Sequence, residues 1–119
     1  MRTLALVLIA LVALLHFYFL VLEMFLWRTR ARRIFHMTLE QAESTAQLAG
    51  NQGLYNGFLA AGLVWALFSG PELVPRASFF LLCVIAAGIY GAITVQRSIL
   101  FVQSVPAAVA LAALWLSQR

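Results

Sequence analysis

Two ionisable residues interrupt the first apolar run of the chain. His16 and Glu23 are seven residues apart. On an α-helix this spacing is two turns, so both side chains share a face and lie about 10 Å apart along the axis. An acid and a base so placed suit a substrate held between them better than a direct hydrogen bond. His16 and Glu23 are therefore the candidate catalytic residues.

A second group of polar side chains opens a later apolar segment. Its members fall within an arc of about 140° on a helix, so they face one side: Asn51, Gln52, Tyr55 and Asn56. The small-residue ridge Gly53-x-x-x-Gly57-x-x-x-Ala61 lies beside that arc, and Ala87-x-x-x-Gly91 offers a matching surface. Small residues at this spacing are typical of closely packed membrane helices. We therefore expect the amides and Tyr55 to line a site and the glycines to contact a neighbouring helix.

The composition explains why these side chains are conspicuous. Of 119 residues, 64% are hydrophobic and 10% charged, and the mean hydropathy is +0.95. Apolar residues occur in long runs, which indicates an integral membrane protein whose partner is the lipid bilayer. The net charge is +4, and all eight basic residues are arginines. Because these arginines flank the apolar runs, they follow the positive-inside rule, and a nucleic-acid partner is not expected.

Four helices are predicted, at residues 3–27, 39–69, 77–96 and 99–116. Thr38 and Gln41 fit a capping box that starts the second helix in water. Gly70 and Pro71 end it, and residues 70–76 form an external turn. Pro106 either begins the last helix or kinks it. The predicted fold is all-α: a single transmembrane domain, an antiparallel up-down bundle of four spanning helices.

Arginine placement sets the orientation. Five arginines fall on one side of the predicted bundle and three on the other: Arg28, Arg30, Arg32, Arg33 and Arg97, against Arg2, Arg76 and Arg119. The larger group marks the cytoplasm, so both termini are expected outside. The first apolar run is retained as a helix because it is too long for a signal peptide. With this orientation the polar side chains gather in the cytoplasmic half, where the later helices add Tyr90, Thr94, Arg97 and Gln103.

Other readings of the polar cluster stay open. Amides between membrane helices often only tie the helices together, and Glu23 can pair with Arg97 near the interface. No metal-ligand spacing, nucleophile elbow, phosphate-binding loop or dinucleotide fingerprint is present. One intramembrane histidine does not supply two axial haem ligands. No metal or cofactor is expected, and the chain favours a non-enzymatic role.

Four motifs together resemble a known family. They are His16-x-Tyr18-x-x-x-x-Glu23-Met-Phe-Leu-Trp27, Asn51-Gln-Gly-Leu-Tyr-Asn-Gly57, Ala87-Gly-Ile-Tyr-Gly91 and Phe101-Val-Gln-x-x-Pro106. The chain resembles domain-of-unknown-function family 1304, which comprises small bacterial integral membrane proteins. The resemblance implies a four-helix protein of the bacterial inner membrane. It brings no established activity, so no catalytic role is carried over.

The leading hypothesis is binding or transport of a small solute in a polar cavity open to the cytoplasmic half. Its lining would be Glu23, Asn51, Gln52, Tyr55, Asn56, Tyr90, Thr94, Arg97 and Gln103, with His16 as the floor. A homodimer is plausible because one four-helix chain is small for a pathway; small multidrug-resistance transporters offer a fold-level analogy. The alternatives are an intramembrane enzyme that uses His16 and Glu23 on a lipid-like substrate, and a structural membrane subunit.

Overall fold

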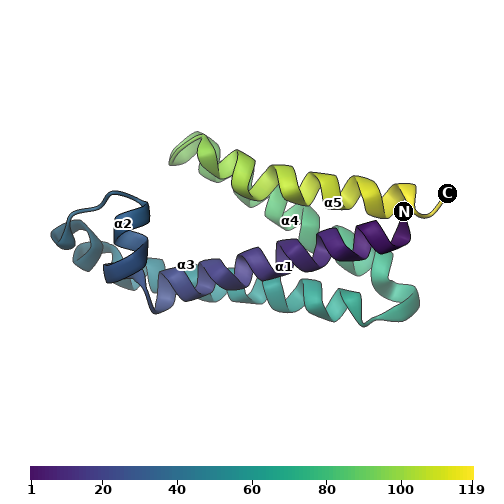
Figure 1. The fold of residues 1–119 in the computed structure, drawn as a ribbon, viewed down its shortest axis with the longest axis horizontal. Helices are drawn as coiled ribbons and strands as arrows, with labels where there is room; N and C mark the ends of the chain where they lie inside the picture. The colour runs from purple at the N-terminus through teal and green to yellow at the C-terminus, as the bar shows by residue number, and fades with distance from the viewer.

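The computed structural model describes all 119 residues, and the chain forms helices without a strand. The four long helices are α1 (Arg2–Met24), α3 (Leu39–Leu67), α4 (Leu73–Thr94) and α5 (Val105–Leu116). Short elements join them: the π-helical turn η1 (Trp27–Ala31), α2 (Arg32–Ile34), the 3-10 turn η2 (Gly70–Glu72) and the π-helical turn η3 (Leu100–Ser104). Figure 1 shows both termini at one end of the molecule. The predicted all-α class is confirmed.

The start of α3 follows from local hydrogen bonding. Thr38 Oγ1 accepts from the backbone N–H of Gln41 at 3.1 Å, and Gln41 Oε1 accepts from that of Thr38 at 2.9 Å. This is the predicted capping box, which satisfies two otherwise free N–H groups. The helix ends at Leu67, shortly before Gly70, whose φ of 57° lies in the left-handed region that glycine favours.

The two later helices begin differently from the prediction. α4 starts at Leu73 rather than near residue 77, because η2 runs directly into it. Pro75 lies in its first turn, where a missing N–H costs no helical hydrogen bond. The expected helix at 99–116 divides into η3 and α5. Pro106 is the second residue of α5, but η3 runs into α5 without a break, so Pro106 follows a π-helical turn inside a helical run rather than starting one.

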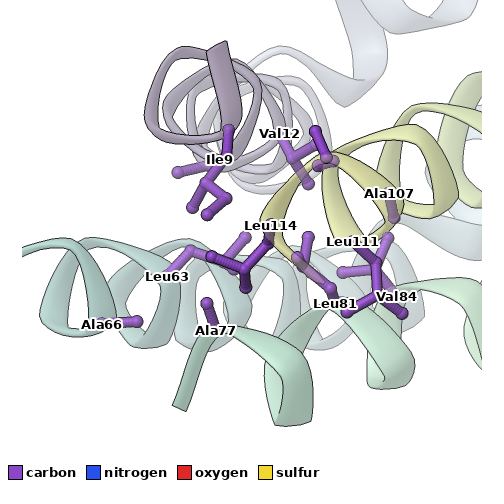
Figure 2. Close-up of a cluster of buried hydrophobic side chains, with 14 of the residues drawn as sticks. Ile9, Val12, Leu63, Ala66, Ala77, Leu81, Val84, Ala107, Leu111 and Leu114 are labelled. Atoms are coloured by element: carbon purple, nitrogen blue, oxygen red, sulfur yellow. The ribbon is translucent and has the colours of Figure 1, made fainter. Parts of the chain in front are cut away.

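The hydrophobic core lies at the end that carries the termini. Figure 2 shows its side chains converging from all four long helices, with Ile9 of α1, Leu63 of α3, Leu81 of α4 and Leu114 of α5 fully buried. α1 packs on α3 and α5, and α4 packs on the same two helices. We call this part of the molecule the core half.

Toward the other end, α4 and α5 diverge from α1 and α3 (Figure 1). This end carries η1 with α2, and the turn that follows α4; we call it the arginine half. Buried contacts here are made within two helix pairs. Gly53 of α3 lies against α1, and Gly88 of α4 lies against Ser104 at the end of η3.

Two helical segments are long and apolar enough to cross a membrane, judged by length and composition: Arg2–Met24 and Gly70–Thr94. Only 28% and 22% of their apolar windows are buried within the chain. Leu100–Leu116 is apolar but shorter. α3 does not meet the same criterion. The four-span topology therefore stays a prediction for α3 and for the last segment.

Candidate functional site

Glu23 and Asn56 form the one direct contact between predicted site residues of different helices. Glu23 lies in the last turn of α1, and Asn56, which is 7% exposed, lies near the middle of α3. The Asn56 Nδ2 donates a hydrogen bond to Glu23 Oε1 at 2.5 Å. The amide and the carboxylate thus join α1 to α3 in the arginine half.

Glycine allows this contact. A Cβ atom at Gly53 would lie 2.8 Å from Met24 Cγ and 2.9 Å from Glu23 Cβ, and one at Gly57 would collide with Leu20. The ridge that was expected to meet Ala87 and Gly91 therefore packs against α1 instead. That part of the prediction was wrong: a Cβ at Gly91 would meet Ile99, beyond the turn after α4. Gly53 and Gly57 thus lie against α1 within the chain.

The Glu23 carboxylate has little electrostatic compensation. Asn56 provides its only side-chain hydrogen bond, and the chain contains no ion pair. Arg97 does not pair with it; that arginine is exposed in the turn after α4. Glu23 is nevertheless half-buried on an apolar helix. A carboxylate in such surroundings is costly unless a positive group or a proton neutralises it.

His16 lies two turns from Glu23 on the same helix, and it is only 1% exposed. Its Nδ1–H donates to the Val12 carbonyl oxygen at 2.8 Å, and its Nε2 is buried without a partner. The ring packs edge-on to Phe19, with centroids 5.3 Å apart. In the neutral ring Nε2 is then a lone-pair acceptor. The structure does not connect His16 to Glu23.

The other candidates on α3 form no hydrogen bond with Glu23 or Asn56. Asn51, Gln52 and Tyr55 are exposed, and none donates or accepts a side-chain hydrogen bond. Tyr55 is 60% exposed and stacks edge-on to Phe58. Sequence periodicity grouped Asn56 with these three residues. Asn56 instead shares the face of Gly53, three residues before it, because that face meets α1.

The candidates from the later helices belong to the α4–α5 pair. Tyr90 is 71% exposed, and its carbonyl oxygen accepts a hydrogen bond from Thr94 Oγ1 at 2.7 Å. Arg97 is exposed and Gln103 is half-buried in η3. None is hydrogen-bonded to Glu23 or Asn56. These residues share the arginine half with Glu23 but lie on its other helix pair.

One buried polar residue of this half was not among the sequence candidates. Ser104, which is 5% exposed, donates from Oγ to the Ile85 carbonyl oxygen at 2.8 Å. A Cβ at Gly88 would clash with Ser104, so the two small residues bring η3 against α4. The pairing of a glycine with a serine on an adjacent apolar helix is the signal that would have indicated this contact.

Two grooves adjoin α1, and both are apolar. The larger, of about 690 Å³, runs between α1 and α3, and eleven of its twelve lining residues are hydrophobic. The other, of about 470 Å³, lies on α1 alone. Neither is lined by Glu23, Asn56 or His16. No group of three or more His, Cys, Asp or Glu side chains converges in a way that could hold a metal ion.

Comparison with known proteins establishes the family. The family model described as "Protein of unknown function (DUF1304)" matches residues 10–115, and the chain belongs to that family, as the motifs around Glu23 and Asn56 predicted. The chain is also 34% identical over 106 residues to the uncharacterized protein YpaA of Lactococcus lactis subsp. lactis strain IL1403. That match covers 87% of this chain and 89% of YpaA. No solved structure matches the chain.

Proposed function

We propose that the chain is a multi-pass protein of the bacterial inner membrane with four spanning helices. The exposed apolar surface supports this: Leu11, Leu14 and Phe17 of α1 are each more than half exposed, as are Trp65 and Phe68 of α3. Lipid covers such a surface at no cost, whereas water does not. The five residues of η3 and twelve of α5 continue one another and span about 25 Å, close to the hydrocarbon thickness.

In this proposal the arginine half faces the cytoplasm and both termini face outward. The run Arg28–Arg33 and the turn with Arg97 lie at that end, which satisfies the positive-inside rule. The long α3 then projects its polar first turns, with Glu40 and Glu43, into the cytoplasm. The Glu23–Asn56 contact lies on the cytoplasmic side of the membrane.

Within this frame, we infer that the protein binds a small cationic solute at Glu23. The supporting observation is the Glu23 carboxylate, which accepts a hydrogen bond from Asn56 and pairs with no cation of the chain. Ionisable groups at membrane depth mark ligand or proton sites by default. A cationic ligand supplies the missing positive charge, and the Asn56 amide orients the carboxylate toward it.

The remaining candidates give this site its second wall. Tyr55 of α3 and Tyr90 of α4 present largely exposed rings, and aromatic faces attract organic cations. Gln52 and Gln103 add amide groups from the two helix pairs. A solute at Glu23 would be enclosed when α4 and α5 approach α1 and α3, which is the movement that transport of the solute would require.

The test uses tetraphenylphosphonium as a lipophilic cation and calorimetric titration of the purified protein in mild detergent. Glu23→Gln keeps the side-chain shape and removes the charge, so binding is expected to disappear. Glu43→Gln, on the exposed start of α3, is the matched control and leaves binding unchanged. Because protons compete for the same carboxylate, wild-type affinity should rise with pH. Equal affinity in wild type and Glu23→Gln would overturn the proposal.

A structural role is the second candidate, and the Asn56–Glu23 hydrogen bond itself favours it because it ties α1 to α3. In that case Glu23→Gln changes stability only. The enzymatic alternative has less support, because His16 is 1% exposed and a general base must reach its substrate. Activity on a lipid-like substrate that is lost in His16→Ala would restore it.

A further inference from the structure

The outward face of α1 carries an apolar groove that the other helices leave uncovered. Its volume is about 470 Å³, and all of its lining residues are hydrophobic and come from α1: Leu11, Leu14, Leu15, Phe17, Tyr18 and Val21. Leu14 is 64% exposed and Phe17 54% exposed. Both side chains also line the larger groove between α1 and α3, so the two grooves form one continuous apolar surface.

A positive charge lies beside Tyr18, one of the residues that line this groove. The guanidinium carbon of Arg30, in η1, lies 5.9 Å from the centroid of the Tyr18 ring. At this distance the ring attracts the guanidinium, which therefore lies next to the groove. The turn that carries Arg30 is itself anchored, because Trp27 Nε1 donates to Thr45 Oγ1 of α3 at 3.0 Å. An apolar trough thus lies beside a positioned cation.

The neighbouring charges leave that cation available. Arg28, Arg30 and Arg33 are exposed, and no arginine of the segment forms an ion pair. Glu40 and Glu43 at the start of α3 belong to the same end of the molecule, yet they pair with none of them. The local charge is positive and uncompensated, which attracts an anion.

We propose that this groove and Arg30 bind a phospholipid with a net negative headgroup. An acyl chain lies along Leu14, Phe17 and Val21, and the headgroup phosphate accepts hydrogen bonds from the Arg30 guanidinium. Arginine presents a planar fork of donors that matches phosphate. The inference rests on the membrane placement proposed above, but not on the solute site at Glu23.

Charge favours a lipid over a second copy of the chain on this face. A two-fold dimer with both chains in the same orientation would bring Arg30 of each copy toward the other beside the same apolar groove. Like charges in that arrangement repel. An anionic lipid instead complements both parts of the surface, the apolar trough and the cation beside it.

The test is native mass spectrometry of the protein released from mild detergent that contains equal amounts of phosphatidylglycerol and phosphatidylcholine. Wild-type protein should retain phosphatidylglycerol preferentially. Arg30→Gln should lower that preference about fivefold, the effect of one arginine near a charged lipid surface. Arg119→Gln makes the same charge change at the opposite end and should leave the preference unchanged. Tyr18→Phe keeps the ring and the preference, whereas Tyr18→Leu reduces the preference.

Three results would overturn the proposal. Equal retention of the two lipids by wild type would show that the groove does not select charge, and equal losses in Arg30→Gln and Arg119→Gln would show an effect of net charge alone. Displacement of phosphatidylglycerol by inorganic phosphate would show that the groove holds no acyl chain. Glu23→Gln measured in the same way should keep the lipid preference while losing tetraphenylphosphonium, so the two proposals fail separately.

Discussion

The two halves of the molecule solve the packing of apolar helices differently. In the core half, small and aliphatic side chains such as Ala77 and Leu114 interdigitate between four helices and are fully buried. In the arginine half, glycine contacts hold helices in pairs, Gly53 with α1 and Gly88 with Ser104. Every polar candidate except His16 lies in or beside that second half. The core half supplies the packing that holds the fold, and the arginine half keeps helix faces free for other contacts.

Small side chains along η3 and α5 mark the part of this segment that packs on other helices. Ser104, Ala107, Ala110 and Ala113 repeat every three residues, and all are buried. This stripe of small residues allows α5 to approach α1 and α4 together. It ends at Ser104; before it stands Phe101, which is 66% exposed. Before Ser104 the chain still contacts α4, where a Cβ at Gly91 would meet Ile99, while α4 and α5 together diverge from α1 and α3 (Figure 1).

The largest expected effect on stability comes from truncating a buried side chain, and it should differ between the two halves. Leu63→Ala removes a fully buried leucine from the core half and should lower the free energy of unfolding by about 3 kcal/mol through lost contacts and a residual cavity. Leu54→Ala, on the same helix but 42% exposed in the arginine half, should change it little. Unfolding in mixed micelles with increasing SDS measures both. Equal losses would show that the two halves do not differ in packing.

The next effect tests the close approach of α1 and α3. Gly53→Val should cost about 2 kcal/mol, because its Cβ would meet Met24 and Glu23 on α1. Gly50→Val is the matched control, since nothing lies within 4 Å of a Cβ at that position. The same SDS titration compares the two variants. If Gly50→Val were as damaging as Gly53→Val, helix propensity rather than helix contact would explain the glycines.

Much of the local structure follows from the sequence alone. The capping box at Thr38, the stop at Gly70 and the all-α class depend on neighbouring residues, and these predictions are confirmed. Sequence reasoning also placed Glu23 and Asn56 in one site. It did so from the position of each residue along its helix. Once the two helices are assumed to be antiparallel, the residue numbers show which side chains lie at the same level.

Helix partners could not be predicted in the same way. An arc of polar residues shows which side chains share a face, but not which helix that face meets. Gly53 and Asn56 were assigned to different faces, although both meet α1. The divergence of α4 and α5 was missed for a related reason. The divergence depends on the sizes of side chains that different helices place at the same level. Residue spacing within one helix gives no information about those sizes.

A smaller effect is expected at the Glu23–Asn56 hydrogen bond. Side-chain hydrogen bonds between membrane helices average about 0.6 kcal/mol, because the competing states also find partners. A double-mutant cycle with Glu23→Ala and Asn56→Ala should show coupling of about that size. The cycle with Glu23→Ala and Gln52→Ala should show no coupling. Gln52 is exposed and forms no hydrogen bond with the Glu23 carboxylate. Coupling to Gln52 as strong as to Asn56 would mean that the whole polar arc surrounds Glu23.

The smallest expected effects concern two tryptophans, one in each half, whose side chains hydrogen-bond to a neighbouring helix. Trp115 Nε1 of α5 donates to Ser78 Oγ of α4 at 2.8 Å in the core half, and Trp27 Nε1 donates to Thr45 Oγ1 at 3.0 Å in the arginine half. Replacement of either by Phe removes one hydrogen bond, worth about 0.5 kcal/mol. If the core half unfolds as one unit, Trp115→Phe lowers global stability.

Trp27→Phe should act differently, because η1 packs on α1, α2 and α3 but contributes no residue to the four-helix core, so it can open locally. We expect faster amide hydrogen exchange confined to residues 25–37, with unchanged exchange in α5. Hydrogen exchange followed by mass spectrometry distinguishes the two variants. If Trp27→Phe also accelerated exchange throughout α5, the arginine half and the core half would unfold together as one cooperative unit.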